Sequence, residues 1–323
     1  MLFYKDAGNE KQPRTVTRYT EQNRNHPPSM HIDLHTHTTA SDGVLSPREL
    51  VARAESCGVR ILSITDHDTV AAYAELDGLQ TDLRLIPGIE FSTQWRRTEI
   101  HVVGLDIRLD DPELSRGIAA QRKSREQRTE RIAARLEKLG LPDPLPAVQA
   151  IAGSRAAGRP HFARYLVDSG RVADMSQAFK KYLAVGKPAY CRPDWAPLEE
   201  IITWIRGAGG TAVLAHPAHY KLTRTKLAAL VTAFQGMGGT AMEVVSGVQT
   251  PGVTASLARI CTRHGLLASC GSDFHRARPG GAQPGGFDAV PSSCTPVWHD
   301  WDINDSKSLV ASSLTAPGFP TPH

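Results

Sequence analysis

Short apolar segments alternate with helical patterns along most of this chain, and the alternation restricts the fold more than any other feature of the sequence. Repeated units of a strand followed by a helix are typical of a parallel sheet covered by helices. The alternation therefore predicts an α/β fold, most simply a barrel. The predicted strands are residues 30–35, 59–68, 83–93, 99–107, 211–217, 241–246 and 267–275, and helices are predicted over 46–58, 198–209, 226–238 and 254–265.

The first predicted helix has clear start and stop signals. Ser46 stands at the N-cap position, Pro47 in the first turn and Gly58 at the end, which is the usual order of these residue types. Residues 106–190 break the alternation. A long helical pattern covers 116–140, and 158–183 contains two shorter ones. We therefore expect an all-helical cap insertion of about 80 residues (106–190) that emerges from the active end of the barrel.

Length and composition agree with this division. A chain of 323 residues, 41% hydrophobic and 22% charged, is long enough for one large α/β barrel. Both ends are polar and lack a hydrophobic period. We expect a disordered tail over 1–29, a barrel over 30–105 and 191–302, and a loose C-terminal tail over 303–323. The net charge of +4 suits an anionic substrate, but predicts little by itself.

Five cysteines without a Cys-x-x-Cys pair predict reduced thiols, rather than a disulfide framework or a zinc–thiolate site. No stretch approaches the 18 apolar residues of a membrane span, and the first 30 residues contain no apolar segment of the secretory type. The sequence therefore predicts a cytoplasmic protein with no membrane contact. No obligate protein partner is visible in the pattern.

Histidines and carboxylates gather where the predicted strands end. His35, His37 and Asp42 come after the first strand, and His67 after the second. In a barrel of parallel strands these ends meet on one face, where catalytic sites are built. We expect the whole set to share one pocket, with the remaining members at or near the later strands: Glu90, His101, His216, Asp273 and His275.

The type and number of these side chains indicate a metal centre. His35 and His37 are two residues apart, so along an extended chain both can reach one ion. Mixed imidazole and carboxylate ligands suit Mn²⁺, Fe²⁺ or Zn²⁺, whereas Mg²⁺ and Ca²⁺ prefer oxygen. Nine candidates exceed the needs of one ion. Two or three divalent ions, with Glu90 as a carboxylate bridge, account for the number, and manganese is the metal we expect first.

Single residues have simpler explanations. One histidine at a strand end is more often a hydrogen-bonded or surface residue than a ligand, and we assign His31 and the remaining histidines to that class. Asp33 points away from the face shared by His35 and His37, so it is expected either to support the ligands from behind or to have a structural role. Asp66 and Asp68 flank His67, and either could orient its ring. Nine such residues at matching positions are hard to produce by chance.

The motifs "HIDLHTHTTASDG", "ITDHDT", "GIEFST", "IHVVGLDI", "AVLAHP" and "GSDFH" resemble, in order, those of the PHP (polymerase and histidinol phosphatase) superfamily. The resemblance implies a distorted seven-stranded (β/α) barrel that holds two or three metals. It implies one metal on His35, His37 and Asp273, and a second metal held by Asp42, His67 and His275. A third would lie on His101 and His216, with Glu90 bridging.

The insertion is similar to that of the 3′,5′-nucleoside bisphosphate phosphatases, through "RIAARLEKLG", "GRPHFARYLVDSG", "AFKKYLAVGKPAY" and "HPAHYKLTRTKL", with "CTPVW" following later. The likeness implies a phosphoric monoester hydrolase that removes the 3′-phosphate from substrates such as pAp, giving 5′-AMP. The alternative is a 5′-to-3′ exoribonuclease on short RNA with the same metals. A remote alternative is a non-catalytic nucleotide-binding protein. His219 stands where this group usually has an arginine, which makes anion contact there weaker or dependent on pH.

For such a reaction, a metal-bound hydroxide held by Asp42, His67 and Glu90 would attack phosphorus, with His216 or His275 as the acid. A second phosphate needs a holder of its own, and guanidinium forks fit phosphate geometry. The candidates for this contact are Arg159, His161, Lys187 and Tyr220.

Overall fold

A computed structural model describes residues 31–153 and 157–301 of the chain. The two predicted tails, 1–29 and 303–323, lie outside the described residues. Seven strands form one sheet, and their order in the sheet is their order in the sequence. The strands are β1 (Ile32–Asp33), β2 (Ile61–Ile64), β3 (Arg84–Trp95), β4 (Thr98–Leu105), β5 (Thr211–Leu214), β6 (Ala241–Ser246) and β7 (Leu267–Gly271).

The sheet is mixed rather than wholly parallel, which corrects the expectation from the alternating pattern. β4 pairs antiparallel with both β3 and β5, whereas the other neighbouring strands pair parallel. β3 and β4 are joined directly through Arg96 and Arg97, with Arg96 at φ +57°. A turn this short returns the chain beside itself, because a parallel connection needs a crossover of a dozen or more residues.

Backbone contacts between the segments after β1 and β7 close the sheet into a barrel. The N–H of Leu34 donates to the carbonyl of Cys270 (3.2 Å), and that of His37 to Phe274 (2.9 Å). In the opposite direction, the N–H of Asp273 donates to His35 (2.9 Å). The distorted seven-stranded barrel with helices is therefore confirmed, and its closure brings residues 34–37 beside residues 270–274.

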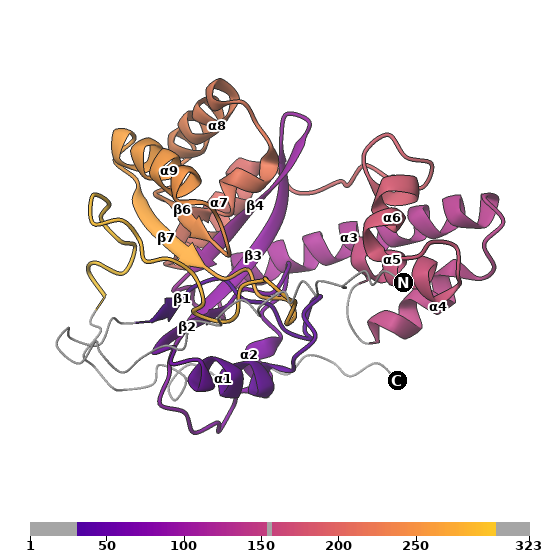
Figure 1. The fold of residues 1–323 in the computed structure, drawn as a ribbon, viewed down its shortest axis with the longest axis horizontal. Coiled ribbons are helices and arrows are strands. Elements are labelled where there is room, and N and C mark those ends of the chain that lie inside the picture. Colours follow the sequence, from indigo (N-terminus) through magenta and orange to yellow (C-terminus); the bar gives the residue numbers. More distant parts are fainter. Residues whose placement is uncertain (1–30, 154–156, 302–323) are drawn as a thin grey trace, which may run out of the picture. The chain divides into compact units, whose positions relative to one another are not determined.

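The helices cover the outside of the barrel (Figure 1), with α1 and α2 beside β1 and β2, and α7 to α9 beside β5 to β7. The start of α1 agrees with the prediction: Ser46 and Glu49 form a capping box, Pro47 is the first helical residue and Gly58 follows at φ +82°. These helices are α1 (Pro47–Ser56), α2 (Ala72–Glu75), α7 (Leu198–Gly207), α8 (Arg224–Gly236) and α9 (Pro251–Arg263), with a short 3₁₀ helix η2 (Pro217–Tyr220) after β5.

The described residues between 112 and 183 form several helices joined by short turns, as the broken alternation indicated. The first half of α3 packs on α7, and its second half joins α4 to α6 in a separate apolar cluster that includes Ile132, Leu136, Phe162 and Leu166. α4 was not among the predicted helices. The division into barrel and cap domains stays a prediction. The helices are α3 (Pro112–Lys138), α4 (Pro144–Ala152), α5 (Arg159–Asp168) and α6 (Met175–Ala178), which continues into the π-helical turn η1 (Phe179–Leu183).

Across the described residues, none of the helices combines the length and apolarity that a membrane crossing requires. All five cysteines are free, which agrees with the expectation of reduced thiols. Four of them are buried in apolar surroundings, so they act as small core residues.

Candidate metal centre

All nine predicted ligands meet at one end of the barrel. Their side-chain nitrogen and oxygen atoms fall into four overlapping groups, and within each group the atoms lie within 4.8 Å of one another. The groups are His37, Asp42, His67 and His275; His35, His37 and Asp273; His35, Glu90 and His216; and His67, Glu90 and His101. The first two match the two ligand sets that the resemblance implied, with His37 shared between them.

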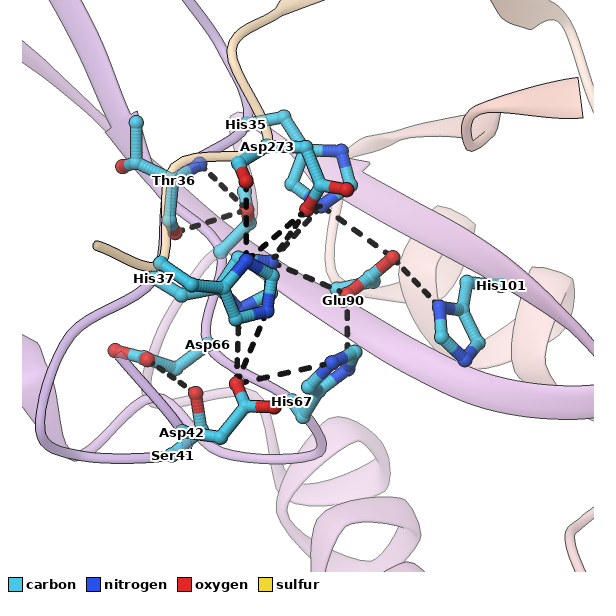
Figure 2. A network of polar contacts seen from close by, with 12 residues as sticks. His35, Thr36, His37, Ser41, Asp42, Asp66, His67, Glu90, His101 and Asp273 are labelled. Carbon is cyan, nitrogen blue, oxygen red and sulfur yellow. Dashed lines mark hydrogen bonds and ion pairs between the residues drawn. The ribbon is translucent and has the colours of Figure 1, made fainter. Parts of the chain in front are cut away.

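Glu90 lies at the centre of the cluster (Figure 2). Its Oε1 is 2.9 Å from His101 Nδ1 and 3.0 Å from His216 Nε2, while its Oε2 is 2.8 Å from His67 Nδ1. The predicted strand over 83–93 contains Glu90, although a position at the end of that strand was expected for a ligand. Glu90 lies within β3, because that strand runs on to Trp95 as one arm of the hairpin with β4. A carboxylate that faces three histidines is well placed to bridge two cations.

The other side of the cluster is built from the closing segments of the barrel. Asp273 Oδ1 lies 3.4 Å from His37 Nε2 and 3.6 Å from His35 Nε2. His275 Nε2 lies 3.2 Å from Asp42 Oδ1. Residues from the two ends of the chain therefore face one another because β7 closes on β1.

Close backbone approaches and uncommon dihedral angles fix these positions. A Cβ atom on Gly271 would lie 2.2 Å from His35 Cβ, and one on Gly43 would lie 2.4 Å from the His37 carbonyl oxygen. His216 and Asp273 adopt positive φ angles, +26° and +52°. Such conformations cost about 1–3 kcal/mol in a residue with a side chain, and they gather at functional sites.

Sequence analysis missed Glu243, on β6. Its Oε1 is 2.6 Å from His35 Nδ1, and its Oε2 accepts a hydrogen bond from the His216 backbone N–H (2.6 Å). The side chain is 1% exposed. One signal could have revealed it: a carboxylate inside the apolar strand "AMEVVS" is costly without a partner. Glu243 holds one predicted ligand by its ring and another by its backbone.

Three neighbouring acids hold the surrounding loops. Asp33 accepts backbone N–H bonds from Ser272 (2.9 Å) and Gly285 (2.8 Å), so its expected structural role is confirmed. Asp66 accepts from Thr38 and Ser41 in the loop that carries Asp42. Asp68 binds Arg125, Gln121 and the Ser92 N–H instead.

The ionisation states of the cluster favour the binding of cations. Burial raises the pKa of Glu90, but His101, His67 and His35 outweigh it and hold the pKa well below its usual range. Burial, assisted by His275, lowers the pKa of His37 to about 3. Burial also lowers the pKa of His275, but Asp42 outweighs it and the pKa rises to about 10. A cation would displace that proton, as metal binding at imidazole usually does.

The donor set fits transition-metal ions. His35 Nδ1 lies 2.6 Å from the Glu243 carboxylate, and its Nε2 lies 3.1 Å from His37 Nε2. A proton on Nδ1 held by Glu243 would leave Nε2 to face a cation. His37 Nδ1 and His216 Nδ1 are buried without a hydrogen-bond partner among the described residues. Unsatisfied nitrogens beside ionised carboxylates are what a cation would coordinate.

A cavity of about 130 Å³ lies beside the cluster, lined on one side by Asp42, His67 and His101. Its other side consists of side chains from the helical segment and from the chain that follows it. This side includes three guanidinium groups, those of Arg125, Arg128 and Arg159, and the ring of Trp195. We call this space the arginine cavity. Sequence analysis identified Arg159 but missed the other two arginines, which lie within the long charged helix.

The four predicted substrate contacts are placed differently. Arg159 lines the arginine cavity and pairs with Glu99. His161 is buried and its Nδ1 accepts from the Gly158 N–H (3.0 Å). Lys187 is exposed and does not line the cavity. The Tyr220 hydroxyl accepts from the His101 N–H (3.0 Å) and donates to the Ala215 carbonyl (2.6 Å), so it braces two strands next to the cluster.

Comparison with known proteins gives a consistent result. Residues 33–142 match the family model of the PHP domain. The chain is 44% identical to a protein named 5′-3′ exoribonuclease Rnm from Escherichia coli (strain K12), over 84% of this chain and 93% of that protein. It is 40% identical to a protein named 3′,5′-nucleoside bisphosphate phosphatase from Chromobacterium violaceum, over 83% and 95% of the two chains.

A solved structure from Chromobacterium violaceum, described as an amidohydrolase with bound sulfate and no metal, has the same fold. It superimposes with a TM-score of 0.75 at 38% identity, and covers 83% of this chain and 94% of its own.

Proposed function

The chain belongs to the PHP domain family, and on that premise we propose that it is a metal-dependent phosphoesterase that removes the 3′-phosphate from nucleoside 3′,5′-bisphosphates. With pAp the products would be 5′-AMP and inorganic phosphate. One observation carries the proposal: nine imidazole and carboxylate side chains converge beside a cavity lined by arginines. The 40% identity to a bisphosphate phosphatase supports the substrate.

We propose that all nine predicted residues hold two or three divalent ions, manganese first, with Glu90 as the bridge. Bound ions of this kind supply an activated water and neutralise charge on the phosphoryl oxygens. The chain's own residues orient the reactants: Glu243 fixes the His35 ring, and the loop held by Asp66 presents Asp42. His216 or His275 stays the predicted proton donor to the leaving oxygen, a role that requires a ring nitrogen not bound to an ion.

The substrate's second phosphate would lie in the arginine cavity, where Arg159 is the best supported of the four predicted contacts. Sulfate bound in the relative of 38% identity has the shape and charge of such a group. Contacts from His161, Lys187 and Tyr220 remain predictions, and so does the cytoplasmic location.

A second activity, 5′-to-3′ hydrolysis of short RNA, is favoured by the 44% identity to an exoribonuclease. The same cluster would act on a phosphodiester, and the same cavity would take the 5′-terminal phosphate. Both activities break the bond between phosphorus and the 3′-oxygen of the terminal nucleotide. They differ in whether that phosphorus also carries the rest of the RNA, so one site can perform both.

Phosphate release from pAp with added Mn²⁺ tests the main proposal. We expect turnover by the wild type and loss of at least a hundredfold in His37→Ala, because a buried ligand is removed. His299→Ala, at an exposed histidine outside the cluster, is the matched control and should keep full activity. No turnover above that of His37→Ala would contradict the proposal. A 5′-phosphorylated oligoribonucleotide in the same assay measures the second activity, and a chain that binds nucleotide and metal without either turnover would be a binding protein.

A further inference from the structure

We propose that Glu99 limits the affinity of the site for substrate and product. Its carboxylate competes with the substrate's uncleaved phosphate for Arg128 and Arg159. Glu99 is on β4, two residues before His101, and lines the arginine cavity. The inference rests on the proposed function, because it takes the cavity as the site of the second phosphate.

Each oxygen of Glu99 binds a different guanidinium. Oε1 lies 3.0 Å from Arg128 NH2, and Oε2 pairs with Arg159 NH2. The carboxylate is 18% exposed and Arg128 is 7% exposed, so solvent screens these contacts only weakly. A phosphate that enters the cavity would meet the same two guanidiniums, since forked donors suit both kinds of oxyanion.

Charged groups of both signs meet in the cavity. Three guanidinium groups line it, whereas two carboxylates are paired with them: Asp68 with Arg125, and Glu99 with both of the others. The Nε of Arg125 is buried without a partner among the described residues. Asp42 also lines the cavity, so three carboxylates face three guanidiniums, and Glu99 is the one that pairs with two of them.

Positioning of the arginines depends on more than Glu99. Arg128 Nε donates to the Cys191 carbonyl (3.1 Å), and its guanidinium lies 5.5 Å from the centre of the Trp195 ring. Arg159 is the first residue of α5, followed by Pro160, which fixes the start of the helix. Loss of the Glu99 charge would thus free guanidinium donors. The contacts with Cys191 and Trp195 would still hold the Arg128 guanidinium in the cavity, and the start of α5 would still place the Arg159 backbone beside it.

The product makes such a residue useful. 5′-AMP retains the uncleaved phosphate, so every contact that holds this group in the substrate also holds it in the product. Binding the substrate and the product equally tightly slows product release without lowering the barrier to the chemistry. A carboxylate that repels the phosphate shifts the equilibrium between bound and free 5′-AMP toward the free product.

Equilibrium binding of 5′-AMP and of adenosine to the full-length chain, measured by calorimetry, tests the proposal. A charge about 7 Å from a phosphate, at an effective dielectric constant of about 20, changes affinity by up to about fiftyfold. Solvent and the two guanidiniums reduce this, and we expect Glu99→Gln to bind 5′-AMP about tenfold more tightly than the wild type. Adenosine affinity should be unchanged, and product inhibition by 5′-AMP should strengthen by the same factor.

Glu126→Gln, on the exposed face of α3, is the control for loss of one carboxylate and should bind as the wild type does. Arg159→Gln, at a less buried position, should weaken 5′-AMP binding by about tenfold or more. It tests the premise that the phosphate binds Arg159, so the proposal can still be refuted if Glu99→Gln does not fold. Equal or weaker 5′-AMP binding by folded Glu99→Gln, an equal shift for adenosine, or unchanged binding by Arg159→Gln would overturn the proposal. Because 5′-AMP has no 3′-phosphate, these measurements stand apart from turnover of pAp, whose absence would instead refute the proposed function.

Discussion

Replacing Glu243 with glutamine changes one buried charge and almost no volume, so it isolates what this residue does for the metal centre. The carboxylate accepts from the His35 ring and from the His216 backbone, both at 2.6 Å. A glutamine has only one carbonyl oxygen. If that oxygen faces the His35 ring, its NH₂ group meets the His216 N–H, donor against donor.

The expected loss follows from these two contacts. One charge-assisted hydrogen bond contributes about 1.5–3 kcal/mol, and about 1.4 kcal/mol corresponds to a factor of ten. Glu243→Gln should therefore weaken metal binding by about 10- to 150-fold, which agrees with the effect of removing a partner that orients a ligating histidine. The fold should survive, because the apolar neighbours of β6 are unchanged.

Two assays measure this loss. Competition with a chromogenic chelator gives the affinity for Mn²⁺, and the dependence of phosphate release on Mn²⁺ gives the concentration needed for half activity. Glu200→Gln, at an exposed position of α7, is the matched control. We expect Glu243→Gln to need at least tenfold more Mn²⁺ and to approach the wild-type rate at saturation. If folded Glu243→Gln binds Mn²⁺ as tightly as the control, the reasoning about His35 is refuted.

Three further predictions concern the barrel, the ion pair and the metals. Gly271→Ala should lower the free energy of unfolding in urea by about 1–3 kcal/mol, because the new Cβ meets His35. Gly252→Ala, where a Cβ would have no atom within 4 Å, is the control. Equal stability of the two variants would count against the close packing at Gly271. Burial raises the pKa of Glu99, but Arg159 and Arg128 outweigh it and hold the pKa below its usual value, so the ion pair stabilises the fold above about pH 4.3. That contribution is lost as pH falls through the folded pKa, so the stability difference between wild type and Glu99→Gln should shrink towards pH 3, and a difference that stays constant would disprove this. Removal of bound metal by a chelator should lower the thermal midpoint and abolish phosphate release, with both restored by Mn²⁺; a midpoint that does not move would argue against ligation by the nine residues.

Local signals in the sequence were sufficient for most of the elements. Ser46, Glu49 and Pro47 form a helix start that depends on residues within four positions of one another, and α7 to α9 follow from apolar periodicity. The candidate ligands could also be found, because a histidine or carboxylate at the end of an apolar strand is costly unless it is used.

These local signals indicate neither the direction of a strand in the sheet nor the contacts between residues far apart in the sequence. The pattern of β4 is the same whether its neighbours run parallel or antiparallel, and only the short turn at Arg96 reverses it. Glu243 and Arg128 carry no motif, so their importance appears only when β6 is beside His35 and α3 beside Glu99.

By itself, the sequence determined which side chains this protein has available for chemistry and which local elements carry them, since propensity, capping and periodicity act over a few residues. The tertiary structure decided which of these side chains interact electrostatically or through a hydrogen bond. Closure of β7 on β1 brings Asp273 to His37 across more than two hundred residues, and electrostatic coupling depends on distance in space rather than on distance along the chain.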